Sequence, residues 1–583
     1  MSLDLLSELT TRENKCNPNF INKLNLINNL LETDTSKDCI AFNDSIWNDL
    51  SIFKIDGIFS KILRCKTYFG LLTLYQIITT PTYSKPKWQL KIKQLVDVNS
   101  KVQLEECNSI LQNINSYQSD VLWFIEKRSE SEQKLLKYLF FTNKYFQLLN
   151  KNRISLYVQF IYKCIMQPCY LIFSPLLCII VPYFILKFKF KLKMSIVSYI
   201  SLLKKIVPNS FSMFGRLNLS NKGTIWVYLS TISTILFYFQ SIYSQFNQIN
   251  QLFDIVKDIK NKVKSITKCF LLVEKLESIV NYDNTKIKVP EYLLNTSNLY
   301  TDYLWKYQKI INDDKQIFKD LFKKIGKIDF IVGIANYYLE LKNNNYPVCF
   351  PEYLNDTTTY LYYKDIWHPL LYKKSITLNS VELGGTKLKR NMLITGPNAG
   401  GKSTIAKSIC INILLAQSIG ISHSSSFSFV PYKTIYTHFR LNDVEGDRSL
   451  FQEEIERCAF LLKNKDNGNF IATFDELFCS TSHLEGMSCA FSLCKLLGEC
   501  KNSSLIVTTH YKLLTKLEET NASFMNCQME CFVKDNIPQF TYNLLKGVSK
   551  VQVALKLLEK NKYTKDVIIK ADEILNDLVK NEN

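Results

Sequence analysis

Hydrophobic and polar positions along this chain follow two different periods. Residues 1–150 repeat apolar positions with helical spacing and contain few Gly or Pro, so they predict a mainly helical region. A lysine-rich helical pattern returns over residues 254–345. After a proline-punctuated stretch at residues 346–354, strand-like and helix-like runs alternate. That alternation predicts an α/β domain in the C-terminal part of the chain.

Residues 164–186 interrupt the helical pattern, because these 23 residues carry no charge. At a rise of about 1.5 Å per residue, a single helix of this length could cross a bilayer. A second uncharged stretch covers residues 223–253, but its strongly apolar part, residues 225–239, is only fifteen residues long. The connecting loop, residues 187–222, holds eight basic residues and no acidic residue.

Two interpretations of these apolar stretches stay open. A membrane hairpin explains the lack of charge, since soluble helices rarely extend this far without a charged residue. A pair of buried helices explains Pro168, Pro175 and Pro182, each of which removes a backbone donor and tends to kink a helix. If both flanks are cytosolic, a hairpin that dips into the membrane without crossing it agrees better with the positive-inside rule, because its basic loop then lies on anionic headgroups.

The composition excludes some classes of protein. Apolar residues make up 46% of the 583 residues and charged residues 21%, so the chain is neither disordered throughout nor collagen-like. The net charge is +19; residues 366–583 hold 26 basic and 22 acidic residues, so +15 belongs to residues 1–365. This excess suits nucleic acid or anionic lipid, although an A+T-rich coding genome gives a similar lysine content without selection for binding.

Seventeen cysteines are scattered singly, without a CxxC pair. Neither a disulfide framework nor a zinc site is expected from this spacing. The pattern predicts a reduced, intracellular location, cytoplasmic or nuclear, with membrane association as the alternative that the apolar stretches leave open.

The clearest chemical motif is GPNAGGKST, which fits G-x-x-x-x-G-K-[ST] between a predicted strand and a predicted helix. Backbone N–H groups of such a loop surround phosphate oxygens, and the helix N-terminus favours negative charge. Lys402 is expected to reach the β- and γ-phosphates of ATP, and the Ser403 hydroxyl to bind Mg²⁺. The predicted nucleotide-binding residues of this loop are Gly396, Pro397, Asn398, Gly400, Gly401, Lys402, Ser403 and Thr404.

Two further motifs follow apolar runs downstream. Asp475 ends the first run and is predicted to hold the Mg²⁺ shell, while Glu476 is predicted to orient or deprotonate the attacking water. His510 ends the next run, where it could sense the γ-phosphate. The simpler alternatives are a surface turn for the acidic pair and a polar strand cap for the histidine.

With these three elements in place, residues 322–575 resemble the MutS family of DNA mismatch-repair ATPases. HPLL (368–371) and TLNSVEL (377–383) resemble the family's segments near the adenine, and FDELFCSTS and TTHY stand where the family has DEIGRGTS and ATHY. The resemblance implies an ABC-like ATPase with ATP and Mg²⁺ as cofactors, double-stranded DNA as a partner, and a homodimer or heterodimer. It also implies that Asn379 lies near the adenine and that Ser449 is offered to the partner subunit's nucleotide, with Phe451 and Glu454 beside it.

The chain departs from the family at several points. Phe478-Cys479-Ser480 replaces Gly-Arg-Gly, Leu450 replaces the usual Thr, and the family's mismatch-probing Gly-x-Phe-Tyr-Glu segment is absent from the sequence. The chain therefore resembles a truncated paralog without a mismatch-recognition domain. An ABC transporter subunit is excluded, since no LSGGQ-type signature lies between the phosphate loop and the acidic pair.

The patterns and the resemblance together predict five segments. They are a helical core or lever region (1–150), an apolar hairpin with a basic loop in place of the clamp (151–253), a second helical lever region (254–365), a P-loop α/β ATPase domain (366–545) and a C-terminal helix-turn-helix for dimerisation (546–583). Two functions remain: a dimeric MutS-type ATPase that binds mismatched or structured duplex DNA, or a membrane-associated ATPase of the same fold that acts on a membrane or protein partner.

Overall fold

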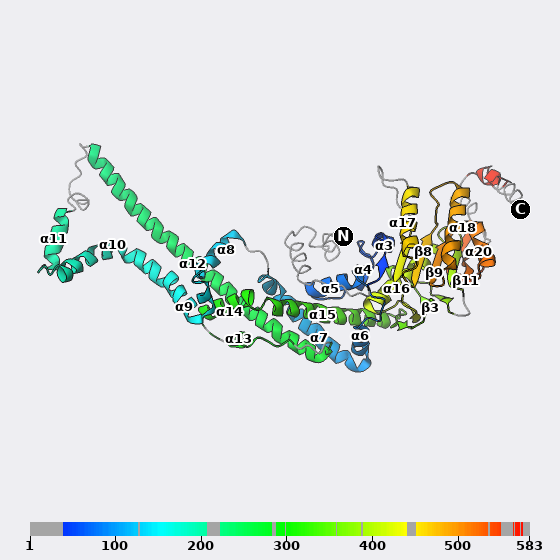
Figure 1. The fold of residues 1–583 in the computed structure, drawn as a ribbon, viewed down its shortest axis with the longest axis horizontal. Coiled ribbons are helices and arrows are strands. Elements are labelled where there is room, and N and C mark those ends of the chain that lie inside the picture. Colours follow the sequence, from blue (N-terminus) through cyan, green and yellow to red (C-terminus); the bar gives the residue numbers. More distant parts are fainter. Residues whose placement is uncertain are drawn as a thin grey trace. The chain divides into compact units, whose positions relative to one another are not determined.

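A computed structural model gives the fold of the chain (Figure 1). It describes residues 39–125, 129–206, 222–282, 287–295, 297, 299–356, 358–385, 389–439, 450–534, 537–549, 564, 566–571 and 573–574. The chain forms two compact units. The first comprises Met1–Gln118, Leu272–Lys286 and Lys319–Asn583, and the second comprises Ser119–Leu271 and Ile287–Phe318.

The first unit contains a mixed sheet of seven strands in the order β1-β7-β8-β9-β5-β10-β11. Every neighbouring pair is parallel except β10 and β11. A smaller sheet has the order β2-β6-β3-β4. The strands are β1 (Ala41–Phe42), β2 (Glu352–Tyr353), β3 (Tyr360–Ile366), β4 (Asn379–Gly384), β5 (Asn391–Thr395), β6 (Ser426–Phe429), β7 (Thr434–His438), β8 (Phe470–Asp475), β9 (Ser503–Thr508), β10 (Phe524–Lys534) and β11 (Ile537–Lys546).

Helices cover both faces of the large sheet. The helices of this α/β part are α16 (Lys402–Ile419), α17 (Leu450–Asn464), α18 (His483–Glu499), α19 (Lys512–Thr515) and α20 (Leu517–Thr520). Successive side chains of a strand point to opposite faces. Accordingly, Phe470 and Phe474 of β8 join the buried cluster formed with α17 and α18, whereas Thr473 bonds to Cys410 of α16 with 2.7 Å between Oγ1 and Sγ. The predicted α/β alternation is therefore present in the C-terminal region.

Helices from the N-terminal region pack on this α/β part within the same unit. They are α3 (Ile46–Asp49), α4 (Ile58–Ile62), α5 (Tyr68–Thr79), α6 (Gln89–Val96), α7 (Lys101–Leu122) and α15 (Lys315–Asn343). Close approach of α5 and α15 requires glycine, because a Cβ at Gly326 would lie 2.3 Å from Thr73 Oγ1. At the far end of α16, Trp88 Nε1 donates to Ser418 O at 3.1 Å. The sequence pattern did not predict that β1, from this helical region, adds an edge strand to the sheet beside β7.

The second unit is helical in its described part. Its helices are α8 (Glu130–Leu139), α9 (Arg153–Ile161), α10 (Gln167–Phe184), α11 (Ile196–Ile206), the start of α12 (Lys222–Val280), α13 (Glu291–Leu294) and α14 (Tyr300–Asn312). A short 3-10 helix covers Gln147–Lys151, and π-helical turns at Tyr162–Met166 and Ile185–Lys189 flank α10.

The apolar segment predicted from residues 164–186 is helical but exposed in this unit. We call α9, α10 and α11, with the turns between them, the apolar arm. Tyr170, Phe173 and Leu176 of α10 are 68%, 55% and 55% exposed. Of the described helices, one stretch, Arg153–Leu177, is long and apolar enough to cross a membrane, and 11% of its most apolar window is buried. The structure therefore does not support the interpretation of buried helices for this segment.

Candidate active site

Strand order brings the three sequence motifs to one edge of the sheet. Strands β8, β9 and β5 are neighbours and parallel, so their carboxyl ends lie side by side. The glycine-rich loop follows β5, the acidic pair ends β8, and His510 follows β9. Ligands of open α/β sheets bind in the crevice outside these strand ends.

The loop after β5 leads directly into the first turn of α16. Gly401 caps this helix with φ +94, a left-handed conformation that favours glycine, and a Cβ there would lie 3.1 Å from the Tyr542 ring. The N–H groups of the first helical turn lack partners within the helix and face the loop. This geometry leaves the helix N-terminus free to interact with an anion.

Lys402 lies folded over the loop and is 4% exposed. Its Nζ donates to Gly396 O at 2.9 Å and to Pro397 O at 3.3 Å, and it lies 2.9 Å from His510 Nε2. The ammonium group is thus held at the mouth of the loop, where an anionic ligand would meet it.

Asp475 and Ser403 are in direct contact. Ser403 Oγ donates to Asp475 Oδ1 at 2.9 Å, and Thr508 Oγ1 donates to the same oxygen at 2.5 Å. Asp475 is opposite Thr508 in the β8–β9 register, which explains the second contact. The pair presents hydroxyl and carboxylate oxygens, the ligand types that suit Mg²⁺. Thr508 was not among the predicted site residues, although its place at the end of β9 follows from the same strand pattern.

Glu476 and His510 form a second contact beside this pair. His510 Nε2 lies 3.0 Å from Glu476 Oε1 and 2.8 Å from Asn398 Oδ1. When Nε2 carries a proton it can donate to either oxygen, and when it does not it can accept from Lys402. Three predicted site residues, Lys402, Glu476 and Asn398, therefore meet at the Nε2 atom of a fourth, His510.

A cavity of about 690 Å³ is lined by the loop with Lys402 and Ser403 and by the acidic pair, Asp475 and Glu476. His510 contacts two of these lining residues, Lys402 and Glu476. His368 also lines the cavity; burial lowers the pKa of His368 to about 4, so the ring is neutral near pH 7, and its Nδ1 accepts from Leu370 N at 3.2 Å. Tyr542 of β11 and Met529 of β10 complete one wall. Neither was predicted, because both come from strands far along the sequence that carry no recognisable motif.

Asn379 lines the cavity at the start of β4, yet both polar atoms of its amide bond to the backbone of β11. Its Nδ2 donates to Tyr542 O at 3.1 Å, and its Oδ1 accepts from Leu544 N at 2.7 Å. Asn379 therefore anchors β11 in this structure, and its contact with a nucleotide stays a prediction.

The residues that differ from the family pattern pack against the start of α17. Phe478 and Phe451 have ring centroids 6.0 Å apart, and Ser480 Oγ donates to Glu454 Oε2 at 2.5 Å. Phe478 adopts φ +55, at the position where the family has glycine. Ser449 and most of the predicted helix-turn-helix, 546–583, lie outside the described residues.

The fold and the cavity define an α/β domain of the class that binds its ligand at the carboxyl ends of parallel strands. Residues 392–579 match the family model described as MutS domain V. The C-terminal part of this chain is therefore similar to the MutS family.

Three relatives illustrate the similarity, and each is named endonuclease MutS2. Those of Staphylococcus haemolyticus and Staphylococcus saprophyticus are 28% and 29% identical over 253 residues, covering 43% of this chain and 31% of each relative. That of Staphylococcus aureus is 28% identical over 253 residues, covering 43% of this chain and 33% of the relative. The chain thus matches about a third of the length of these proteins.

Proposed function

We propose that the α/β domain binds ATP with Mg²⁺ and hydrolyses the nucleotide. The observation that carries this proposal is that Lys402, the Ser403–Asp475 pair and Glu476 line one cavity, while His510 contacts Lys402 and Glu476. Each pair joins residues at the ends of two different strands, so the arrangement combines phosphate-binding and acid–base groups in one place.

The residues take distinct roles in this proposal. Lys402 leaves the loop carbonyls and binds the β- and γ-phosphates, and the N–H groups at the start of α16 bind the remaining phosphate oxygens. Ser403 and Asp475 would hold Mg²⁺, which when bound neutralises charge on the phosphates. Glu476 orients the attacking water and accepts its proton, and His510 fixes the Glu476 carboxylate and contacts the γ-phosphate.

Replacing Glu476 tests this assignment. We expect Glu476→Gln to lower ATP turnover by about 100-fold or more, because general base catalysis typically supplies that factor. Binding of a fluorescent ATP analogue should be retained, since Gln keeps the size of the side chain. Glu499→Gln on the exposed surface of α18 is the matched control. Turnover near the wild-type rate in Glu476→Gln would show that the base lies elsewhere.

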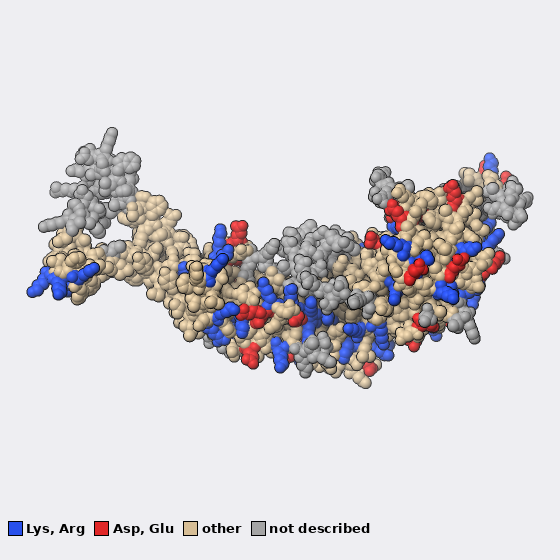
Figure 2. Space-filling model, viewed as in Figure 1, with Lys and Arg blue, Asp and Glu red and all other residues tan. Residues whose placement is uncertain are grey.

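Duplex DNA is the partner that the MutS family suggests. Supporting it, lysines and arginines gather over the helical parts of the face shown in Figure 2, and residues 1–365 carry +15 of the net charge. Gel shifts with homoduplex and G·T heteroduplex over a salt series test this function. We expect affinity to fall steeply with salt, because each phosphate contact releases counterions. Absence of binding at low salt would overturn DNA as the partner.

A membrane-associated ATPase is the second candidate function, and the exposed apolar arm favours it. Large apolar side chains cover α9 and α10, and the acid-free stretch that follows carries Lys187, Lys189, Lys191 and Lys193. Figure 2 shows basic side chains gathered between α10 and α11. Such a surface suits the interface of an anionic membrane. Failure of the full chain to float with phosphatidylcholine–phosphatidylserine vesicles would overturn this candidate.

A further inference from the structure

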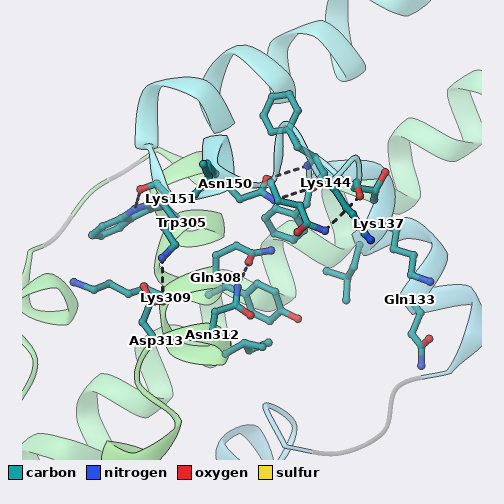
Figure 3. Close-up of a pocket in the computed structure, with 18 residues that line it drawn as sticks. Gln133, Lys137, Lys144, Asn150, Lys151, Trp305, Gln308, Lys309, Asn312 and Asp313 are labelled. Atoms are coloured by element: carbon teal, nitrogen blue, oxygen red, sulfur yellow. Dashed lines mark hydrogen bonds and ion pairs between the residues drawn. The ribbon is translucent and has the colours of Figure 1, made fainter.

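A cavity of about 1220 Å³ lies within the second unit (Figure 3). Its walls come from the end of α8, the loop between α8 and α9, and α14. Leu136, Phe140 and Tyr307 are buried in its floor, where the Phe140 and Tyr307 rings stack with centroids 5.9 Å apart. The cavity therefore has an apolar floor of fixed shape.

Lysines dominate the charge of the walls. Lys137, Lys144, Lys151 and Lys309 line the cavity, with Asp313 as the one acidic lining residue. Lys151 Nζ lies 3.8 Å from Asp313 Oδ1, and Lys309 Nζ lies 4.3 Å from the centre of the Tyr292 ring. Within the described part of the chain, no ion pair engages Lys137 or Lys144. The walls thus present an excess of positive charge to a ligand.

Hydrogen bonds hold the lysine-bearing loop in shape. The Asn150 side chain accepts from Phe141 N and donates to Phe141 O, each at 2.9 Å, which closes the loop on itself. Trp305 Nε1 donates to Lys151 O at 2.8 Å and so fastens the loop to α14. A wall that is already ordered loses little conformational entropy when a ligand binds.

We propose that this cavity binds an organic phosphate through Lys137 and Lys144. Ammonium groups bind phosphate as point charges, the amides of Gln308 and Asn312 can bond to hydroxyl groups, and the floor can contact a carbon ring. The volume of about 1220 Å³ exceeds the range of about 300–1000 Å³ that is typical of small-molecule pockets, so the cavity has room for a whole organic phosphate and not only for a single phosphate ion.

The residues around the cavity favour the headgroup of an anionic phospholipid as the source of this phosphate. The same loop exposes Phe146 and Leu148, and the apolar arm begins two residues after Lys151. Apolar side chains beside basic ones suit a lipid interface better than a nucleic-acid backbone. A lipid headgroup as the ligand rests on the membrane association proposed above. Binding of a phosphate by the cavity does not depend on that association.

Calorimetry on the full chain with inositol 1,4,5-trisphosphate as the soluble probe tests the site. We expect Lys137→Gln/Lys144→Gln to weaken binding by about tenfold or more, equivalent to about 1.4 kcal/mol. Lys134→Gln/Lys257→Gln is the matched control, because both lysines are exposed in the same unit and lie outside the cavity. Absence of saturable binding to the wild-type chain, or equal binding by the two double variants, would overturn the proposal.

Vesicle binding then separates the sources of the phosphate. If the cavity takes a lipid headgroup, Lys137→Gln/Lys144→Gln loses binding to phosphatidylcholine vesicles that contain phosphatidylinositol bisphosphate and keeps its binding to pure phosphatidylcholine. Weaker probe binding with unchanged vesicle binding supports a free organic phosphate and overturns the lipid source. Displacement of the probe by duplex DNA would identify a nucleic-acid site instead. If the chain binds no vesicle of either composition, membrane association is overturned. The phosphate site in the cavity is not, because binding of the soluble probe tests that site separately.

Discussion

Phe478 occupies a backbone conformation that glycine usually takes. Its φ of +55 is unfavourable for a residue with a Cβ, and such positions cost about 1–3 kcal/mol. The side chain is 6% exposed in the cluster under α17 and α18, and its carbonyl accepts from Tyr511 Oη at 3.0 Å. Burial of a phenylalanine is worth about 3–5 kcal/mol when tested by truncation, so packing outweighs the strain.

Restoring glycine at this position tests which effect is larger. We expect Phe478→Gly to lower the free energy of unfolding by about 2 kcal/mol, because the lost burial exceeds the strain that is relieved. Phe478→Leu, which keeps an apolar side chain and the strain, should lose less. Urea unfolding followed by circular dichroism measures both variants. A Phe478→Gly protein as stable as the wild type would mean that the strain cancels the packing.

Among the helices, α10 continues through Pro175 and Pro182. A proline removes the N–H that would bond to the carbonyl four residues earlier, so Pro175 leaves Leu171 O without its helical donor. Tyr238 Oη of α12 donates to Leu171 O at 3.1 Å and to Ile172 O at 2.9 Å. Pro175 is therefore compatible with one long apolar helix, because a neighbouring helix supplies the missing donor.

The contact between α5 and α15 contains a buried carboxylate, Asp329. It accepts from Lys66 N at 2.9 Å and from Thr67 N and Thr67 Oγ1 at 2.7 Å, and burial raises the pKa of Asp329 to about 6. The raised pKa means that the folded chain takes up this proton at a higher pH than the unfolded chain. The contribution of Asp329 to stability is therefore greatest near pH 4 and falls as the pH rises through 6.

Removing this titration should change the pH dependence of unfolding. We expect the stability of the wild type relative to Asp329→Asn to increase by up to about 3 kcal/mol as the pH falls from 7 to 4, from a shift of about two pKa units. Denaturant unfolding at several pH values measures the difference. Asp97→Asn, at an exposed carboxylate, serves as the control. A difference that is constant with pH, or that decreases towards pH 4, would contradict the assignment.

At the scale of the whole molecule, a contact between the N-terminal region and α17 joins two described residues that are 408 positions apart in sequence. Arg457 lies 3.4 Å from Asp49, and Thr437 Oγ1 donates to the same carboxylate at 2.9 Å. Both charged side chains are largely buried, and burial raises the pKa of Asp49 while Arg457 opposes that rise. This network fixes α3 to β7 and to the middle of α17.

Breaking this ion pair should destabilise the first unit. We expect Arg457→Met to lower the free energy of unfolding by about 3 kcal/mol at pH 7, because it leaves a buried carboxylate without its partner. Arg457→Met/Asp49→Asn should recover much of that loss, since no buried charge then remains unpaired. Thermal unfolding of both variants provides the measurement. Equal losses in the single and double variants would show that the pair contributes through packing alone.

Local patterns in the sequence determined much of this protein. The strand–glycine loop–helix order around Lys402, the acidic pair after one apolar run and the histidine after the next were each readable, because hydrophobic periodicity and backbone requirements are local. The predicted residues Lys402, Ser403, Asp475 and Glu476 line one cavity, and His510 contacts Lys402 and Glu476.

Only the tertiary structure decided the remaining features, because they depend on which strands and helices become neighbours. Strand order placed Thr508 against Asp475 and Tyr542 at the cavity, and it joined β1 to a strand almost 400 residues later. Packing also decided that the uncharged segment lies exposed and that four lysines spread between residues 137 and 309 line one cavity. Such contacts join residues far apart in the chain, and no local pattern of side chains encodes them.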